Sequence, residues 1–229
     1  MSESLRNRLY RYFIQGATDH CYGNCLGHFP PGSAILDVGI GNGLMIKKYH
    51  HIIKNKQLKI TGIDINRHYL NQCGSLIQSY GLENNIRIFH EAVELFCPAG
   101  QGCYDFILFS MSFMLFDDQQ AVLKRVIDWL KPDGRLLFFQ TMFRHRSFLM
   151  DFIKPKLKYF TTVDFGSVTY DDQFYDFLGS NRLSVEKDHF IKREWFRGEY
   201  RMIVVNPASP KSWQHPNNCE APKSAMVSR

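Results

Sequence analysis

The chain lacks the features that mark several large protein classes. No apolar run approaches the roughly 18 residues that a membrane-spanning helix needs. The polar, basic stretch MSESLRNRLYRYF contains no apolar core of a secretory signal, so we expect a cytoplasmic protein without membrane contact. Lys and Arg total 28 and give a net charge of +6, but they never form a run of five or six. A nucleic-acid partner is therefore not favoured.

The six cysteines show no CxxC pair. Cys21 and Cys25 are separated by three residues, and no second pair stands at the spacing of zinc ligands. We therefore predict no metal site and expect reduced thiols.

What is present is a regular alternation of apolar strands and amphipathic helices. Strands are predicted at 34–39, 58–65, 85–92, 104–111 and 135–142. Helices are predicted at 43–53, 66–82 and 117–130, with the last two opened by Asn66 and by Asp117 or Asp118 as N-caps. Such alternation indicates an α/β fold, in which a doubly wound parallel sheet is covered by helices on both faces.

The two ends of the chain depart from this rhythm. Residues 3–29 have helical spacing, and we expect 1–31 to form a helical cap. Residues 183–191 and 194–206 read as an antiparallel strand pair, which brings the predicted sheet to seven strands. The aromatic segment 143–182 is interpreted as an insertion before the final strand pair. We predict a single domain over 1–206 and a disordered tail over 207–229.

Three glycines follow the first predicted strand in the stretch ILDVGIGNG, residues 35–43. Glycine lets a ligand approach the backbone where strands of an open sheet end. A dinucleotide uses the order G-x-G-x-x-G, but here Leu44 occupies the third glycine place. An acidic residue followed by G-x-G-x-G, as in Asp37, Gly39, Gly41 and Gly43, resembles the class I S-adenosylmethionine-dependent methyltransferases. The resemblance covers residues 33–142, continues to 206, and implies a Rossmann-like fold in which the insertion 143–182 lies over the acceptor site.

The resemblance implies which residues bind S-adenosylmethionine. Asp37 would balance the positive end of the cofactor. Asp64 lies 21 residues after Gly43, close to the spacing of an acid that bonds ribose hydroxyls. In resembling enzymes the adenine is contacted after the second and third strands, here by Ile65, Glu91 and Ala92. Ser110 would enter the cleft from the fourth strand.

The acceptor is less well indicated, because methyl transfer needs no fixed catalytic residue. His145 and His20 are candidate bases, and the candidate pocket residues are Tyr10, Tyr12, Ser112, Phe113 and Arg144. The stretch SMSF, 110–113, lacks the proline-rich tetrapeptide of nucleobase N-methylating enzymes. We predict methyl transfer to oxygen or nitrogen of a small molecule. A macromolecular methyltransferase, a dinucleotide-dependent oxidoreductase and a non-catalytic cofactor-binding interaction protein stay open as alternatives, and so does the oligomeric state.

Overall fold

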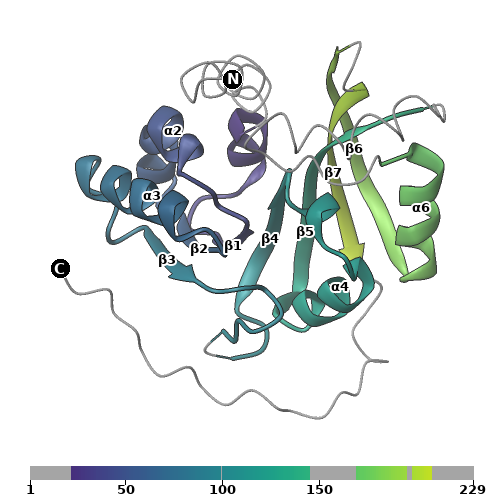
Figure 1. Ribbon diagram of the computed structural model, residues 1–229, viewed down its shortest axis with the longest axis horizontal. Helices are drawn as coiled ribbons and strands as arrows, with labels where there is room; N and C mark the ends of the chain where they lie inside the picture. The colour runs from purple at the N-terminus through teal and green to yellow at the C-terminus, as the bar shows by residue number, and fades with distance from the viewer. Residues whose placement is uncertain (1–21, 99, 145–168, 195–197, 208–229) are drawn as a thin grey trace, which may run out of the picture.

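A computed structural model describes residues 22–98, 100–144, 169–194 and 198–207 (Figure 1). Seven strands form one sheet in the order β3-β2-β1-β4-β5-β7-β6. β7 runs antiparallel to both of its neighbours, and the remaining pairs are parallel. The predicted mostly parallel sheet with an antiparallel C-terminal pair is thus confirmed. The strands are β1 (Ala34–Val38), β2 (Lys59–Asp64), β3 (Ile86–His90), β4 (Tyr104–Ser110), β5 (Leu130–Met142), β6 (Leu183–Glu194) and β7 (Gly198–Pro207).

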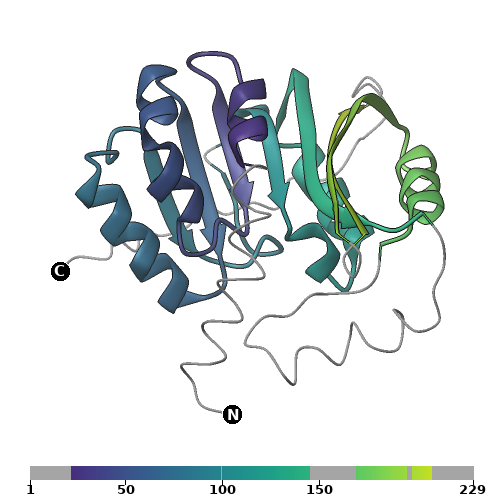
Figure 2. The ribbon, with the colours of Figure 1, turned by 90° about the horizontal axis from the view of Figure 1, so that it is seen from above.

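Helices cover both faces of the sheet (Figures 1 and 2). Residues 22–28 are helical and pack on one face together with α2 (Leu44–Asn55) and α3 (Arg67–Ser79). The other face carries α4 (Gln119–Ile127), α6 (Asp171–Ser180) and the short helix η1 (Phe113–Leu115).

Helices α3 and α4 begin where a side chain caps the first turn. The Asn66 side chain accepts the Tyr69 N–H at 3.2 Å, and the Asp118 carboxylate accepts the Ala121 N–H at 2.8 Å. Each bond satisfies one of the N–H groups that a helix leaves without an internal partner. Asn66 and Asp118 were both predicted as caps.

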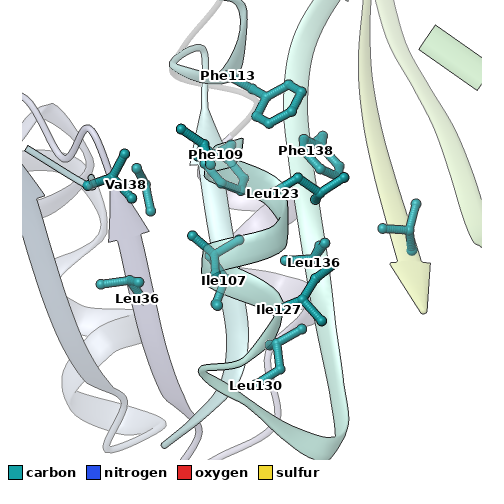
Figure 3. Packing of buried hydrophobic residues seen from close by; sticks show 14 of the residues in the cluster. Leu36, Val38, Ile107, Phe109, Phe113, Leu123, Ile127, Leu130, Leu136 and Phe138 are labelled. Atoms are coloured by element: carbon teal, nitrogen blue, oxygen red, sulfur yellow. The ribbon is translucent and has the colours of Figure 1, made fainter. Parts of the chain in front are cut away.

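The apolar strands are buried on both sides, as expected for the centre of a parallel sheet. Figure 3 shows the packing under α4, where Phe109, Phe113 and Phe138 lie together with ring centroids 4.9–5.3 Å apart. Leu108 and Phe139, from the same strands, face α2 and α3 instead.

The structure differs from the sequence analysis at two places. The fifth strand was predicted to begin at residue 135, but β5 already begins at Leu130. Leu130 pairs with Tyr104, and an irregularity between Tyr104 and Phe106 absorbs the extra residues. The second difference is α6, a helix that was not predicted within the insertion 143–182; Phe174 and Leu178, four residues apart, are its buried side.

Lys56 anchors the helical residues 22–28 to the sheet. Its ammonium group donates to the carbonyl oxygens of Leu26, Gly27 and Phe29 at 2.8, 2.9 and 2.7 Å. Replacing Lys56 by Gln should lower the free energy of unfolding by about 1–3 kcal/mol, because charged hydrogen bonds to the helix end are lost. Urea unfolding measures this. Lys59→Gln is the control, since the Lys59 ammonium donates at 2.9 Å to the Asn84 carbonyl, just before β3, and an equal loss in both variants would contradict the anchoring role.

Three of the described cysteines, Cys25, Cys73 and Cys103, are free thiols. Cys97 is disulfide-bonded, so the expectation of six reduced thiols is wrong for that residue. Within the described ranges, no helix has the length and apolarity required to cross a bilayer. In the same ranges no three His, Cys, Asp or Glu side chains gather as metal ligands would.

Candidate cofactor cleft at the carboxyl edge of the sheet

The strand order reverses beside β1, whose neighbours are β2 and β4. The chain proceeds from β1 to β2 and β3 on one side, and then crosses to β4 on the other. In open α/β sheets, ligands bind in the crevice beyond the carboxyl ends of the strands at such a reversal. The glycine loop follows β1 directly, so it lies at this place.

Asp37 is a buried carboxylate next to the last residue of β1. Its side chain is 0% exposed, and neither oxygen has a hydrogen-bond partner within the described part of the chain. Burial, and secondarily the Asp64 carboxylate, raise the pKa of Asp37 to about 7. Buried polar groups are rarely left unpaired, because each carries a desolvation penalty. A cationic ligand group is the partner that would relieve it.

The glycine loop is held by backbone and side-chain bonds across β2. The N–H groups of Gly39 and Gly41 donate at 2.8 Å to the Ile63 carbonyl and to Asp64 Oδ2. At Gly39 (φ +86°) an added Cβ would stand 2.7 Å from the Ser112 Cβ, while at Gly43 it would stand 3.1 Å from Cys73 in α3. At Gly41 (φ +64°) it would meet no described atom within 4 Å. Internal packing thus requires glycine at 39 and 43, and the open side of the loop is at Gly41.

The residues predicted to bind ribose and adenine gather at the ends of β2 and β3. Asp64 accepts the Gly41 N–H through Oδ2 and the Asn66 N–H through Oδ1, each at 2.8 Å. Ile65 follows with a 73% exposed side chain, and the Glu91 N–H donates to the Asp64 carbonyl at 3.1 Å. Glu91 and Ala92 are half-buried at the end of β3. The carboxylate of Asp64 therefore orients the glycine loop and keeps further lone pairs for a ligand.

Replacing Asp64 by Ala should weaken S-adenosylhomocysteine binding by roughly 1.5–3 kcal/mol, the value of charged hydrogen bonds. Calorimetric titration measures the loss. Because Asp64 also holds Gly41, the titration should be repeated with an analogue that lacks the ribose hydroxyls. A direct ribose contact predicts that the variant and the parent chain differ much less for this analogue. The same loss for both ligands would show that Asp64 acts only through the loop.

The end of β4 approaches the glycine loop from the other side. Ser110 is 7% exposed, and its hydroxyl has no hydrogen-bond partner among described residues. Met111 has a positive φ of 58°, which is uncommon for a residue with a side chain. The Ser112 hydroxyl donates to the Val38 carbonyl, so Ser112 joins β4 to β1. Phe113, one of the predicted pocket residues, is 2% exposed and packs in the core under α4.

Unpaired buried polar atoms concentrate along this edge. The described residues contain eight such side-chain atoms, and six of them belong to Asp37 (two oxygens), Ser110, Gln140, Asp171 and Glu199. These residues lie at or near the ends of β1, β4 and β5 and the starts of α6 and β7. Such clustering is expected where a protein binds a polar ligand or ordered water.

The predicted acceptor residues are only partly placed. Arg144 follows β5 and its Nε bonds Glu199 Oε1 at 2.9 Å. His20, His145, Tyr10 and Tyr12 lie outside the described residues. The sequence analysis did not name Gln140 and Glu199 as site candidates. Both are polar residues inside strands, with exposed fractions of only 1% and 2%. Their one signal in the sequence is a polar residue within an otherwise apolar strand.

The donor set fits S-adenosylmethionine. Its positive end needs an anion that is not already paired, which Asp37 supplies. Its ribose needs acceptor oxygens, which Asp64 supplies next to the open side of Gly41. The N–H groups of Gly39 and Gly41 already donate to the Ile63 carbonyl and to Asp64, so neither is free to bind a pyrophosphate.

Comparison with known proteins agrees with this geometry. The methyltransferase domain model matches residues 35–134. Over 110 residues the chain is 31% identical to the ubiquinone/menaquinone biosynthesis C-methyltransferase UbiE of Wigglesworthia glossinidia brevipalpis, covering 48% of this chain and 43% of UbiE. The chain thus spans less than half the length of that relative. The match removes the dinucleotide alternative that the glycine pattern left open.

Solved structures share the fold at low sequence identity. Geranyl diphosphate C-methyltransferase from Streptomyces coelicolor, a complex with S-adenosyl-L-homocysteine, superposes with a TM-score of 0.63 at 13% identity, over 88% of this chain and 80% of that one. A mitomycin 7-O-methyltransferase superposes with a TM-score of 0.65 at 19% identity, over 89% of this chain and 57% of that one. One fold therefore accompanies methyl transfer to carbon in one protein and to oxygen in the other.

Proposed function

We propose that the chain is a class I S-adenosylmethionine-dependent methyltransferase, which transfers the methyl group of S-adenosylmethionine to a small molecule. The observation that carries this proposal is Asp37. A fully buried carboxylate with two unpaired oxygens, at the end of β1 and in front of the glycine loop, is costly unless a cation binds there.

The chain's own residues would divide the work of binding. Asp37, ionised by release of its proton to solvent, would pair with the α-amino group, while Asp64 would accept from the ribose hydroxyls. Ile65 would contact the adenine face, with Glu91 and Ala92 at its edge. The cofactor, when bound, supplies a methyl group on an already activated sulfonium. The protein then contributes alignment of the acceptor and exclusion of water.

For the acceptor atom we retain oxygen or nitrogen of a small molecule, with His145 and His20 as candidate bases. Carbon is the second candidate, and the relatives favour it, because UbiE is a C-methyltransferase by name. A macromolecular acceptor and a non-catalytic cofactor-binding role are the remaining alternatives. An intact Asp37, glycine loop and Asp64 speak against a site that has lost its ligand.

Two measurements test the proposal. The purified full chain is titrated calorimetrically with S-adenosylhomocysteine and, separately, with NADH, and micromolar binding of S-adenosylhomocysteine alone is expected. Candidate acceptors are then incubated with S-adenosylmethionine carrying an isotopically labelled methyl group, and the chemical shift of the labelled methyl identifies oxygen, nitrogen or carbon. Binding of neither ligand would overturn the proposal, and binding without transfer to any acceptor class would favour the interaction protein.

A further inference from the structure

Strands β5 and β7 extend past the level of the glycine loop. Asp37 is in register with Leu108, and Ser110 with Phe139. β5 continues three residues beyond Phe139 to Met142, which pairs with Glu199 of β7. At about 3.3 Å per residue, these three residues carry β5 roughly 10 Å beyond the level of Ser110, the last residue of β4. Because the proposed cofactor contacts use the ends of β1, β2 and β3, the acceptor must approach from this raised side.

Two arginines meet at the end of the raised strands. Arg144, just after β5, and Arg193, near the end of β6, both donate to Oε1 of Glu199, through their Nε atoms at 2.9 and 3.1 Å. Those two nitrogens are therefore no more than 6.0 Å apart, the sum of the two distances. Side chains of Arg144 and Arg193 are 56% and 61% exposed, whereas that of Glu199 is 3% exposed. A ligand arriving here meets guanidinium groups, with the carboxylate behind them.

The third arginine of the region, Arg201, is already neutralised. It donates to Asp171 at 2.9 Å and to Asp188 at 2.6 Å, and it is only 15% exposed. The Tyr175 hydroxyl also donates to Asp188. Arg201 stands 3.9 Å from Glu199 Oε2, too far for a hydrogen bond, and that oxygen has no hydrogen-bond partner among the described residues. Among the described residues, the exposed end of the cluster is thus left with two cations and one carboxylate.

We propose that Arg144 and Arg193 bind an anionic group of the methyl acceptor, a carboxylate or a phosphate, and that Glu199 positions them. This inference rests on the proposed function and specifies its substrate class. Holding two like charges this close is unfavourable, and a second anion on their exposed side relieves the repulsion. Planar guanidinium groups bind carboxylate and phosphate oxygens in pairs, which gives the acceptor a fixed orientation.

The test uses malonate and inorganic pyrophosphate as probes, at constant ionic strength to cancel screening. Each is titrated calorimetrically into the full chain, with and without saturating S-adenosylhomocysteine. Arg144→Gln and Arg193→Gln are made separately, so that Glu199 keeps one arginine and is not orphaned. We expect saturable binding of at least one probe, weakened roughly tenfold in either variant, as for the loss of one charged hydrogen bond. Preference for one probe identifies the group as carboxylate or phosphate.

Arg135→Gln is the matched control, because Arg135 pairs with Glu186 at the opposite end of β5. It should bind the probes like the parent chain, and thermal unfolding verifies that all variants are folded. Equal affinity in all three variants, or binding that does not saturate, would overturn the inference. S-adenosylhomocysteine affinity is a separate readout. A parent chain that does not bind S-adenosylhomocysteine would contradict the proposed function. A parent chain that binds S-adenosylhomocysteine but neither probe would contradict this inference alone.

Discussion

Asp37→Asn should reduce the affinity for S-adenosylhomocysteine roughly 100-fold, since two charged hydrogen bonds to the α-amino group are lost. The affinity of the parent chain should also depend on pH. Burial raises the pKa of Asp37 to about 7, and the cationic group of the ligand binds the ionised form. Affinity is therefore full above pH 7 and declines as the pH falls below it. The variant should show no such decline.

Asp37→Asn, which weakens ligand binding, should make the stability of the ligand-free chain less sensitive to rising pH than that of the parent chain. The pKa of Asp37 in the folded chain lies above the ordinary aspartate value of 3.8, so the folded state binds more protons between these two values. The stability contributed by the protonated carboxyl is present at acidic pH and is lost as the pH rises through about 7. From pH 5 to 8 the ligand-free parent should lose about 3 kcal/mol relative to Asp37→Asn.

Urea unfolding at both pH values measures this difference, and Asp176→Asn, an exposed carboxylate of α6, is the control. An Asp37→Asn chain that folds and binds S-adenosylhomocysteine like the parent would disprove the role of this residue.

The second large effect is expected at the glycines. Gly39→Ala should destabilise the fold by about 3 kcal/mol or more, because its Cβ would stand 2.7 Å from that of Ser112 and its φ is +86°. Gly41→Ala should cost only about 1 kcal/mol, for a side chain at φ +64° in open space, yet it should weaken S-adenosylhomocysteine binding at least tenfold.

Gly32→Ala is the control for Gly41→Ala. Gly32 also has a positive φ, of +77°, with no described atom near its added Cβ, and it lies before β1, at the opposite end of the strand. Thermal unfolding should show similar losses for the two variants, and calorimetry should show unchanged affinity for Gly32→Ala. Equal affinity in Gly41→Ala and Gly32→Ala would place the cofactor away from the glycine loop.

The sequence predicts the cofactor-binding residues of the site better than the proposed acceptor-binding residues. The cofactor half is local: Asp37, the three glycines and Asp64 lie at or directly after a strand end, and strand ends are visible as limits of apolar runs. The acceptor half is only partly local. Arg193 and Glu199 pair across the β6–β7 hairpin, whereas Arg144 reaches Glu199 only because β7 returns antiparallel beside β5.

The sequence by itself determined the alternation of strands and helices, the antiparallel final pair and the resemblance to methyltransferases, because hydrophobic period and glycine spacing are properties of short segments. Only the tertiary structure decided that Asp37 is fully buried without a partner among the described residues, that Gly39 and Gly43 face protein atoms, and that Phe113 belongs to the core. Burial, pKa and steric contact depend on which distant segments pack together, and packing is a property of the whole fold.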